Sequence, residues 1–256
     1  AGGNGMRIGA QLYTVRDYCR NLNDFSTTLK RIADIGYRFV QVSGTCDFDP
    51  KWLKDRLDEN GLECVLTHTP ADRLLSDPKK VAADHDVYGC KYVGLGWNAF
   101  DLAHDPQDNP NTFYEKYIGV ARALKEHGKY FMYHNHDQEF QKYNGRLILE
   151  TLGEMFDADE MGFTLDTFWI TAGGGDPAWW IENFAGRVPC THLKDFAYGR
   201  KMAVVGEGNI NFDRVFVTAY EAGTEYMLVE QDDCAGESPF DCLRRSYDFL
   251  RSRGFE

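Results

Sequence analysis

Eight short apolar runs recur along the chain, and each is followed by a longer segment whose apolar residues are spaced three or four apart. The first pattern predicts buried strands and the second predicts amphipathic helices. The strand candidates are residues 6–13, 38–44, 63–69, 91–97, 129–135, 161–169, 188–195 and 225–232. Successive runs begin about 30 residues apart, which is the length of one strand–helix unit in a parallel sheet.

Five of the segments between the runs carry recognisable helix ends. They are residues 24–36, 50–61, 111–128, 176–186 and 238–254. Glycine at the carboxyl end, or proline in the first turn, is typical of helix boundaries. Residues 77–88, 146–156 and 212–222 are weaker helix candidates.

Eight such units in a chain of 256 residues predict an α/β protein of the (β/α)8 class, a TIM barrel, formed as a single domain over residues 6–256. An open, doubly wound sheet is the rival fold. It would normally carry a glycine-rich turn after its first strand, and GAQLYTVRD is not such a turn. No Pro- or Ser-rich linker divides the chain, and the longer loop at 98–111 is a candidate cover for the barrel mouth.

Composition excludes several classes of function. The net charge of −12 disfavours a nucleic-acid partner, since such partners are bound by clustered Lys and Arg. No stretch approaches the roughly 18 consecutive apolar residues of a membrane helix. The seven cysteines include no C-x-x-C pair, and the start, AGGNGMRIGAQ, lacks the regions of a signal peptide. We therefore expect a soluble, cytoplasmic protein with reduced thiols, not bound to a membrane, and a homo-oligomer stays open as an alternative to a monomer.

Polar residues gather where the predicted strands end. These positions are Gln11, His68, His134, Asn135, His136, Glu139, Asp166, His192, Lys194, Asp195, Glu230, Gln231 and Asp232. In a barrel the carboxyl ends of all strands meet at one face, where active sites lie. Taken singly, each residue has a structural explanation, such as a helix cap or a hydrogen-bonded core histidine. Together, however, buried charges at several neighbouring strand ends would be unfavourable without a counter-charge, and a divalent cation is the simplest one.

Four of these residues form a natural ligand set for such a cation: Glu139, Asp166, His192 and Glu230. Three carboxylates and one imidazole suit Mn, Mg, Co or Zn better than a metal that requires thiolates.

Six motifs, in order along the chain, resemble the xylose-isomerase-like TIM barrels, specifically the sugar phosphate isomerase/epimerase family. They are IGAQLYTVRD, YHNHDQEF, TLDTFW, HLKD, VGEGNI and LVEQD. The resemblance covers nearly the whole chain and implies a divalent metal held by Glu, Asp, His and Glu from strands five to eight. Asp166, His192 and Glu230 match directly. Many relatives place the fifth-strand glutamate within the strand itself, so Glu139 is assigned here with His134 or His136 as alternatives.

The expected chemistry is proton transfer next to a carbonyl through an enediolate, with Glu139 and Glu230 as proton carriers. This makes the chain a candidate sugar isomerase or epimerase. The expected substrate-binding residues are His68, His134, Asn135, His136, Trp169, Lys194 and Glu207. Two alternatives stay open: a metal-dependent lyase or dehydratase acting on a keto-sugar or inosose, and a barrel that only binds a sugar. No Arg- and Gly-rich cradle for phosphate is evident, which favours an unphosphorylated carbohydrate substrate.

Overall fold

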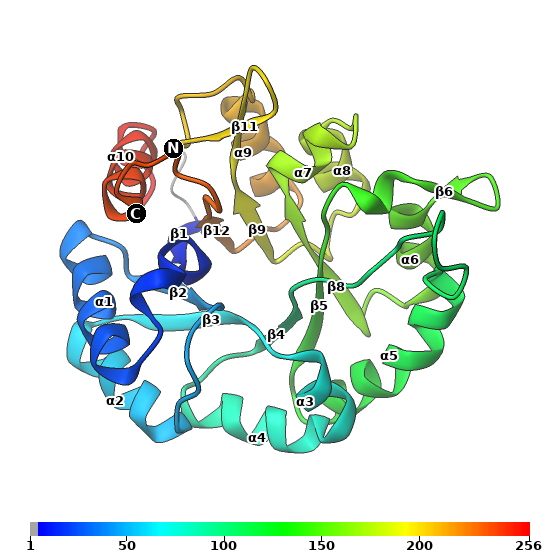
Figure 1. Ribbon diagram of the computed structural model, residues 1–256, viewed down its shortest axis with the longest axis horizontal. Helices are drawn as coiled ribbons and strands as arrows, with labels where there is room; N and C mark the ends of the chain where they lie inside the picture. The colour runs from blue at the N-terminus through cyan, green and yellow to red at the C-terminus, as the bar shows by residue number, and fades with distance from the viewer. Residues whose placement is uncertain (1–4) are drawn as a thin grey trace.

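The computed structural model describes residues 5–256 and shows a closed barrel of eight parallel strands with helices around its outside (Figure 1). The barrel strands are β1 (Arg7–Gln11), β2 (Phe39–Val42), β3 (Glu63–His68), β4 (Tyr92–Leu95), β5 (Tyr130–His134), β8 (Met161–Asp166), β9 (Cys190–Leu193) and β12 (Tyr226–Val229). Their order around the barrel is β1-β12-β9-β8-β5-β4-β3-β2. The predicted (β/α)8 fold is confirmed, and each of the eight predicted runs contains one barrel strand.

The helices cover the outer face of the barrel. They are α1 (Leu22–Ile35), α2 (Pro50–Asn60), α3 (Ala71–Ser76), α4 (Pro78–Val87), α5 (Pro110–Glu126), α6 (Ile148–Met155), α7 (Thr167–Ala172), α8 (Pro177–Asn183), α9 (Phe212–Glu221) and α10 (Pro239–Ser252). Two 3-10 helices, η1 (Leu12–Tyr18) and η2 (Gln138–Phe140), follow β1 and β5. Two small hairpins complete the chain: β6 (Lys142–Tyr143) with β7 (Arg146–Leu147), and β10 (Asp195–Ala197) with β11 (Lys201–Ala203).

The predicted strand 161–169 was too long at its carboxyl end. The strand ends at Asp166, whose carboxylate accepts a hydrogen bond from the backbone N–H of Trp169 at 3.1 Å, and α7 begins immediately. An aspartate at this position caps the first turn of a helix, so the apolar residues after it belong to a helix and not to the strand.

The long loop after β4 packs against the segment that follows β5. The Gln138 side chain accepts the N–H of Phe100 at 2.9 Å, and the Gln141 amide donates to the Phe100 carbonyl at 2.6 Å. These bonds tie the loop to η2, beside the fifth strand end.

The barrel interior is arranged in layers along the strand axis. Side chains alternate between the inside of the barrel and the helix layer because successive strand residues point to opposite faces. A small apolar cluster includes Leu66, Met132, Cys190 and Leu228, one residue from each of four barrel strands. Two residues further along the same strands stand His68, His134, His192 and Glu230. The floor of the barrel is therefore apolar, and the layer above it is polar.

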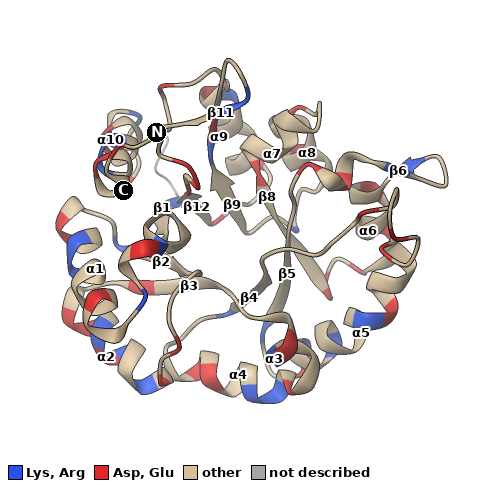
Figure 2. Cartoon of the chain, viewed as in Figure 1, with Lys and Arg blue, Asp and Glu red and all other residues tan. Residues whose placement is uncertain are grey.

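Charged residues lie mainly on the outer helices, where Lys and Arg are interspersed with Asp and Glu in the view of Figure 2. None of the helices within residues 5–256 is long and apolar enough to cross a membrane. The seven cysteines are free thiols. The signal-peptide interpretation concerned the start of the chain, of which residues 1–4 lie outside the described residues.

Candidate metal centre and active site

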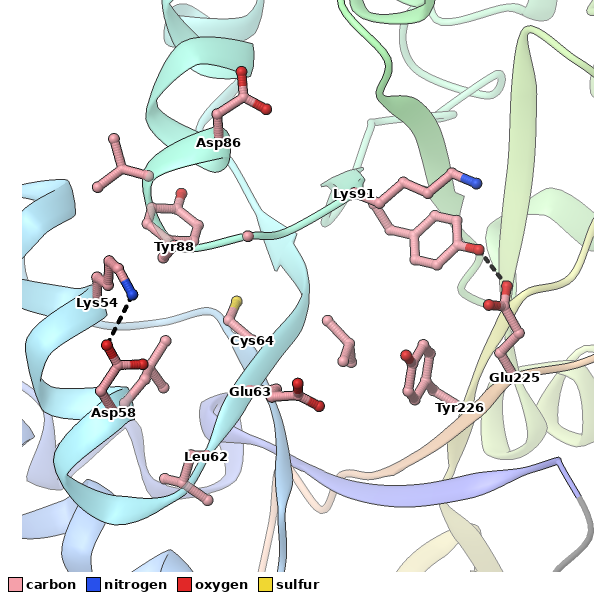
Figure 3. A pocket seen from close by; sticks show the side chains of 15 residues that line it. Lys54, Asp58, Leu62, Glu63, Cys64, Asp86, Tyr88, Lys91, Glu225 and Tyr226 are labelled. Atoms are coloured by element: carbon pink, nitrogen blue, oxygen red, sulfur yellow. Dashed lines mark hydrogen bonds and ion pairs between the residues drawn. The ribbon is translucent and has the colours of Figure 1, made fainter.

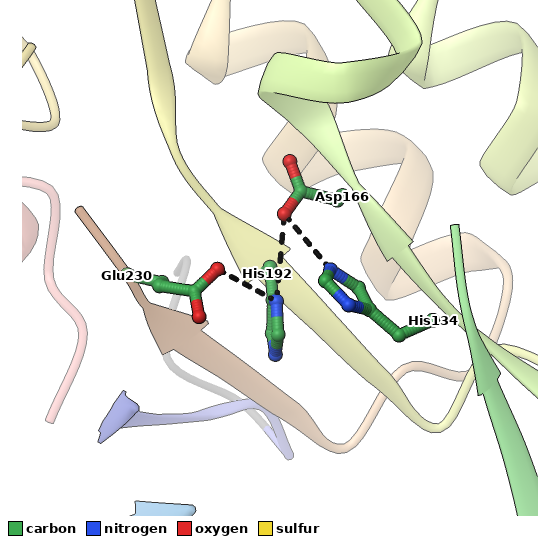
Figure 4. Close-up of side chains that lie close together, drawn as sticks. All are labelled: His134, Asp166, His192 and Glu230. Carbon is green, nitrogen blue, oxygen red and sulfur yellow. Dashed lines mark hydrogen bonds and ion pairs between the residues drawn. The ribbon is translucent and has the colours of Figure 1, made fainter. Parts of the chain in front are cut away.

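Four buried side chains from four neighbouring strands meet at the carboxyl end of the barrel (Figure 4). They are His134, Asp166, His192 and Glu230, and one ligand atom from each lies within 4.8 Å of all the others. Asp166 and His192 are register partners on β8 and β9, and Glu230 directly follows β12. Strand pairing thus brings together residues that lie far apart in the sequence.

The two histidines are oriented by partners outside the cluster. His134 Nδ1 donates to the Gly96 carbonyl at 2.9 Å, and since a carbonyl can only accept, Nδ1 carries the proton. His192 Nε2 lies 2.6 Å from the Gln41 side-chain oxygen. In both residues the second ring nitrogen therefore faces the carboxylates. Metal-binding histidines are commonly held in this way by a hydrogen bond on the opposite nitrogen.

The two carboxylates are positioned as firmly as the histidines. The Gln11 amide donates to Glu230 Oε2 at 2.9 Å. The Asn135 side-chain oxygen accepts the backbone N–H of Asp166 at 2.8 Å, so Asn135 holds the end of β8 in place. Asn135 was expected to bind substrate. In the structure it is fully buried, its side-chain oxygen accepts the Asp166 N–H, and its side-chain nitrogen donates to the His136 carbonyl.

The ligand atoms of the four side chains are arranged in a way that fits a cation. With its proton on Nδ1, His134 presents the lone pair of Nε2 to Asp166 Oδ2 at 3.1 Å, so that two acceptors face each other. Burial, followed by the proximity of His192, lowers the pKa of His134 and keeps its imidazole neutral. His192 Nδ1 and Glu230 Oε1 are buried and lie 3.3 Å apart, and neither makes a well-aligned hydrogen bond within residues 5–256. A positive ion between these atoms would satisfy them all, and two nitrogens with two oxygens suit a divalent transition metal.

A lysine ammonium lies against the same carboxylates. Lys194 is fully buried, and its Nζ lies 3.0 Å from Asp166 Oδ2, 2.7 Å from Glu230 Oε1 and 3.0 Å from Asp232 Oδ1. Burial alone would raise the pKa of Asp166 and Glu230, but Lys194, the leading counter-charge, holds both well below their usual range. Burial works against a protonated His192, yet Glu230 and Asp166 raise its pKa to about 9.

The cluster opens into a cavity of about 480 Å³ at the barrel mouth. Its ionisable walls are His68, His134, His136, Glu230 and Asp232, and Tyr13 and Trp97 stand at the rim. No lysine or arginine of the described chain lines this cavity. Burial and the neighbouring Glu230 raise the pKa of Asp232 to about 7. A neutral polar molecule therefore suits the cavity better than an anion.

A second cavity, of about 470 Å³, lies at the opposite end of the barrel, where β3, β4 and β12 begin (Figure 3). Several of its charged residues have partners: Lys54 pairs with Asp58 at 2.8 Å, and Glu225 accepts the Tyr92 hydroxyl. The amino-terminal face of such barrels is associated with stability rather than chemistry, so the cavity at the mouth is the candidate active site.

Glu139, expected as a metal ligand and proton carrier, lies outside the four-residue cluster. One of its carboxylate oxygens accepts the Tyr133 hydroxyl at 2.5 Å and the other accepts the His136 N–H at 2.7 Å. Tyr133 points into the layer between barrel and helices, so Glu139 lies there too, fully buried. Burial raises the pKa of Glu139 to about 7, although the hydrogen bonds oppose the shift. His134 occupies the fifth-strand place in the cluster.

His68, His136 and Trp169 lie around the cluster. The His68 ring packs on His134 with ring centres 5.2 Å apart, and the Ser43 hydroxyl lies 3.0 Å from its Nδ1. A Cβ on Gly96 would lie 3.0 Å from Nδ1 of this ring, so a larger residue there would push the ring by a few tenths of an ångström. His136 lines the cavity and lies between His134 and Trp169.

Glu207, also expected at the site, points away from it. Its carboxylate pairs with Arg245 of α10 at 2.7 Å, and the side chain is half exposed. The VGEG loop that carries it is held by Asp195, whose carboxylate accepts the backbone N–H groups of Gly206 and Gly208 at 3.0 and 2.9 Å. A Cβ on Gly208 would clash with that carboxylate at 2.5 Å. The glycines of the motif thus anchor the loop to Asp195, and its glutamate forms a surface ion pair with Arg245.

Sequence reasoning missed Gln41 and Ser43, the two residues of β2 and its end that contact site histidines. Both lie at alternate positions of the apolar run RFVQVSG, and Gln11 is a comparable inward-facing polar residue in the first run, MRIGAQLY. A buried polar residue at an inward position of a predicted barrel strand was the available signal.

The chain belongs to the xylose isomerase-like TIM barrel family, whose model matches residues 29–253. It is 26% identical to an inosose dehydratase of Geobacillus kaustophilus strain HTA426, over 96% of this chain and 94% of that protein. A solved sugar phosphate isomerase/epimerase from Parabacteroides distasonis ATCC 8503 matches with a TM-score of 0.82 and 25% identity, covering 97% of this chain and 94% of that one. A solved L-ribulose 3-epimerase shares the fold, with a TM-score of 0.77 and 17% identity over 96% and 94% of the two chains. The relatives carry the names of sugar-modifying enzymes of more than one reaction type.

Proposed function

We propose that the protein is a divalent-metal-dependent enzyme that moves a proton next to the carbonyl of an uncharged sugar or sugar derivative, as an isomerase or epimerase does. The observation that carries this proposal is that His134 and Glu230 belong both to the cation-binding cluster and to the wall of the 480 Å³ cavity. A substrate in that cavity would therefore meet the charged cluster directly.

In this proposal His134, Asp166, His192 and Glu230 hold the metal. A bound divalent ion supplies Lewis-acid polarisation of the substrate carbonyl. Glu230 removes the proton from the neighbouring carbon. The electron pair of that C–H bond forms a C=C bond, and the carbonyl π pair moves onto the oxygen to give an enediolate. Return of the proton to the former carbonyl carbon, with transfer of the hydroxyl proton to the former carbonyl oxygen, gives isomerisation. Delivery of a proton by a second acid to the opposite face of the first carbon gives epimerisation.

The substrate is expected to be uncharged. If all three carboxylates around Lys194 are ionised, the ammonium and one divalent ion would balance their charge. A phosphate or carboxylate group on the substrate would meet Glu230 and Asp232 without an arginine or lysine in the described cavity wall. The site thus favours a sugar, polyol ketone or keto-sugar without a phosphate.

Dehydration is a second candidate, and it is favoured by the cluster itself. Two-sided proton transfer is simplest with a carboxylate on each face of the substrate, whereas the fifth strand here contributes His134 in place of a glutamate. Elimination needs one base and one acid: Glu230 takes the proton, and a protonated neighbour gives a proton to the hydroxyl that leaves as water. The similarity to an inosose dehydratase is consistent with this outcome.

A screen of uncharged aldoses, ketoses and inososes with Mn²⁺, run in D₂O and followed by NMR, tests the proposal. We expect solvent deuterium at the carbon next to the carbonyl, and the product identifies isomerisation, epimerisation or dehydration. Replacing Glu230 by Gln should lower turnover by about 10²- to 10⁴-fold, the effect of losing a positioned proton carrier. Turnover without deuterium incorporation, together with an active Gln variant that retains its metal, would show that proton transfer through Glu230 is wrong.

A further inference from the structure

The Lys194 ammonium contacts the same oxygens that face the two cluster histidines. Asp166 Oδ2 lies 3.0 Å from Nζ and 3.5 Å from His192 Nδ1. Glu230 Oε1 lies 2.7 Å from Nζ and 3.3 Å from the same His192 nitrogen. A metal bound at these oxygens would therefore compete with the Lys194 ammonium for the same two carboxylates.

A third contact gives the ammonium an alternative partner. Asp232 Oδ1 lies 3.0 Å from Nζ, its side chain is 25% exposed, and it is not one of the four cluster residues. Asp232 lines the cavity beside Glu230. Since Nζ touches all three carboxylates at once, a small shift of the side chain would leave it paired with Asp232 alone.

The backbone of Lys194 is fixed, so such a shift would be confined to its side chain. The N–H of Lys194 donates to the Thr167 hydroxyl at 3.0 Å, and its carbonyl accepts that hydroxyl at 2.7 Å. The Trp169 ring lies 5.5 Å from Nζ and forms one side of the space in which the ammonium sits. Nζ is held by three ionic contacts of 3.0, 2.7 and 3.0 Å, so the shift would give up two of these ion pairs and keep the third.

We propose that Lys194 is a built-in cation of the metal-free site: together with His192 it neutralises Asp166 and Glu230 until a divalent ion replaces it, and it then pairs with Asp232. This inference rests on the metal site proposed above. Three carboxylates buried together would repel one another without a counter-charge. With Lys194 present, the barrel folds around this cluster whether or not metal is bound. The same charge opposes metal binding, because like charges a few ångströms apart in a buried site repel strongly.

The test is Mn²⁺ binding to metal-free protein, measured by isothermal titration calorimetry, with thermal unfolding of the same samples. Lys194→Met removes the competing charge while keeping an unbranched side chain, so the dissociation constant for Mn²⁺ should fall about tenfold or more. The metal-free variant should melt at a lower temperature than the wild type, and Mn²⁺ should raise its melting temperature by a larger increment. Lys194→Arg keeps the charge and should show no such tightening.

Lys129→Met is the matched control. Lys129 is also nearly buried and paired with one carboxylate, Asp86 at 2.7 Å, but it precedes β5 at the amino-terminal end of the barrel. Its loss should leave Mn²⁺ affinity unchanged. Weaker or equal Mn²⁺ binding by Lys194→Met would overturn the inference and make the lysine a support that positions the carboxylates.

Asp232→Asn tests the second half of the inference and remains informative if Lys194→Met does not fold. Without Asp232 the ammonium has only the metal-binding carboxylates as partners, so Mn²⁺ binding should weaken. In a Lys194→Met background the same change should have a much smaller effect. Equal or tighter binding by the single Asp232→Asn variant, or an undiminished effect in the double variant, contradicts the exchange.

Failure of the underlying metal site gives a different result. If the wild type binds no Mn²⁺, or if Asp166→Ala and His192→Ala both retain it, the proposed site is wrong. If the wild type binds Mn²⁺ through these residues and Lys194→Met does not bind it more tightly, the site stands and the role of Lys194 falls.

Discussion

Replacing Glu139 by Gln should make the stability of the protein less sensitive to pH. Burial raises the pKa of this carboxyl from 4.5 to about 7 in the folded protein. The folded state therefore binds more protons than the unfolded state between these values, so the free energy of unfolding falls as pH rises through this window. At 1.36 kcal/mol per unit, the shift corresponds to about 3 kcal/mol.

Glutamine has the same shape but does not titrate. Its carbonyl oxygen can still accept the Tyr133 hydroxyl or the His136 N–H, so part of the hydrogen bonding survives. The free energy of unfolding of the variant, relative to the wild type, should therefore rise by about 3 kcal/mol between roughly pH 4.5 and pH 7.5. Urea unfolding of both metal-free proteins at several pH values measures this difference.

Glu160→Gln is a control variant that should change the free energy of unfolding at neutral pH in the opposite direction. Glu160 is also largely buried, but it pairs with Arg122 at 2.7 Å, so its replacement should reduce stability at neutral pH. A difference between Glu139→Gln and wild type that stays constant with pH would refute the argument. It would mean that the hydrogen-bond donors around Glu139 stabilise its charge as well as water does.

Two further predictions concern the metal. His134→Ala should lose bound Mn²⁺ while Glu139→Ala retains it, as measured by the metal content of the purified proteins, and the reverse pattern would restore Glu139 as the fifth-strand ligand. Gln41→Leu removes the acceptor that orients His192, so Mn²⁺ affinity should fall about 10- to 100-fold, the usual effect of losing such a partner. Unchanged affinity in a titration of the folded variant would show that packing alone holds the ring.

The barrel could be predicted from the sequence because its signal is local and repeated eight times. Each strand is a short apolar run, each helix has its own period and end residues, and the spacing leaves few arrangements other than a closed barrel. Asp166, His192 and Glu230 followed from the same logic, since each stands at the carboxyl end of a predicted strand. Their convergence in one cluster required only that the strands be parallel and adjacent.

The fifth-strand residue was decided by tertiary structure. In FMYHNHDQEF, His134 ends the strand and Glu139 follows it closely, and the glutamate that the family resemblance implies as a ligand favoured Glu139. The chain leaves β5 at His134, and η2 then folds Glu139 back to the outward-facing Tyr133. Strand alternation from Met132 places His134 inside the barrel, and this alternation is a local signal that favours the histidine.

The partners of Gln41, Ser43 and Lys194 lay beyond sequence reasoning for a different reason. Their roles depend on which atoms approach across the barrel, between strands far apart in the chain, and side-chain pairing of that kind leaves no periodic trace. The sequence by itself determined the strands, their order and the kinds of group at their ends. Only the closed barrel decided which of those groups share one buried space. The charges and hydrogen bonds in that space depend on distances between strands that lie far apart in the sequence.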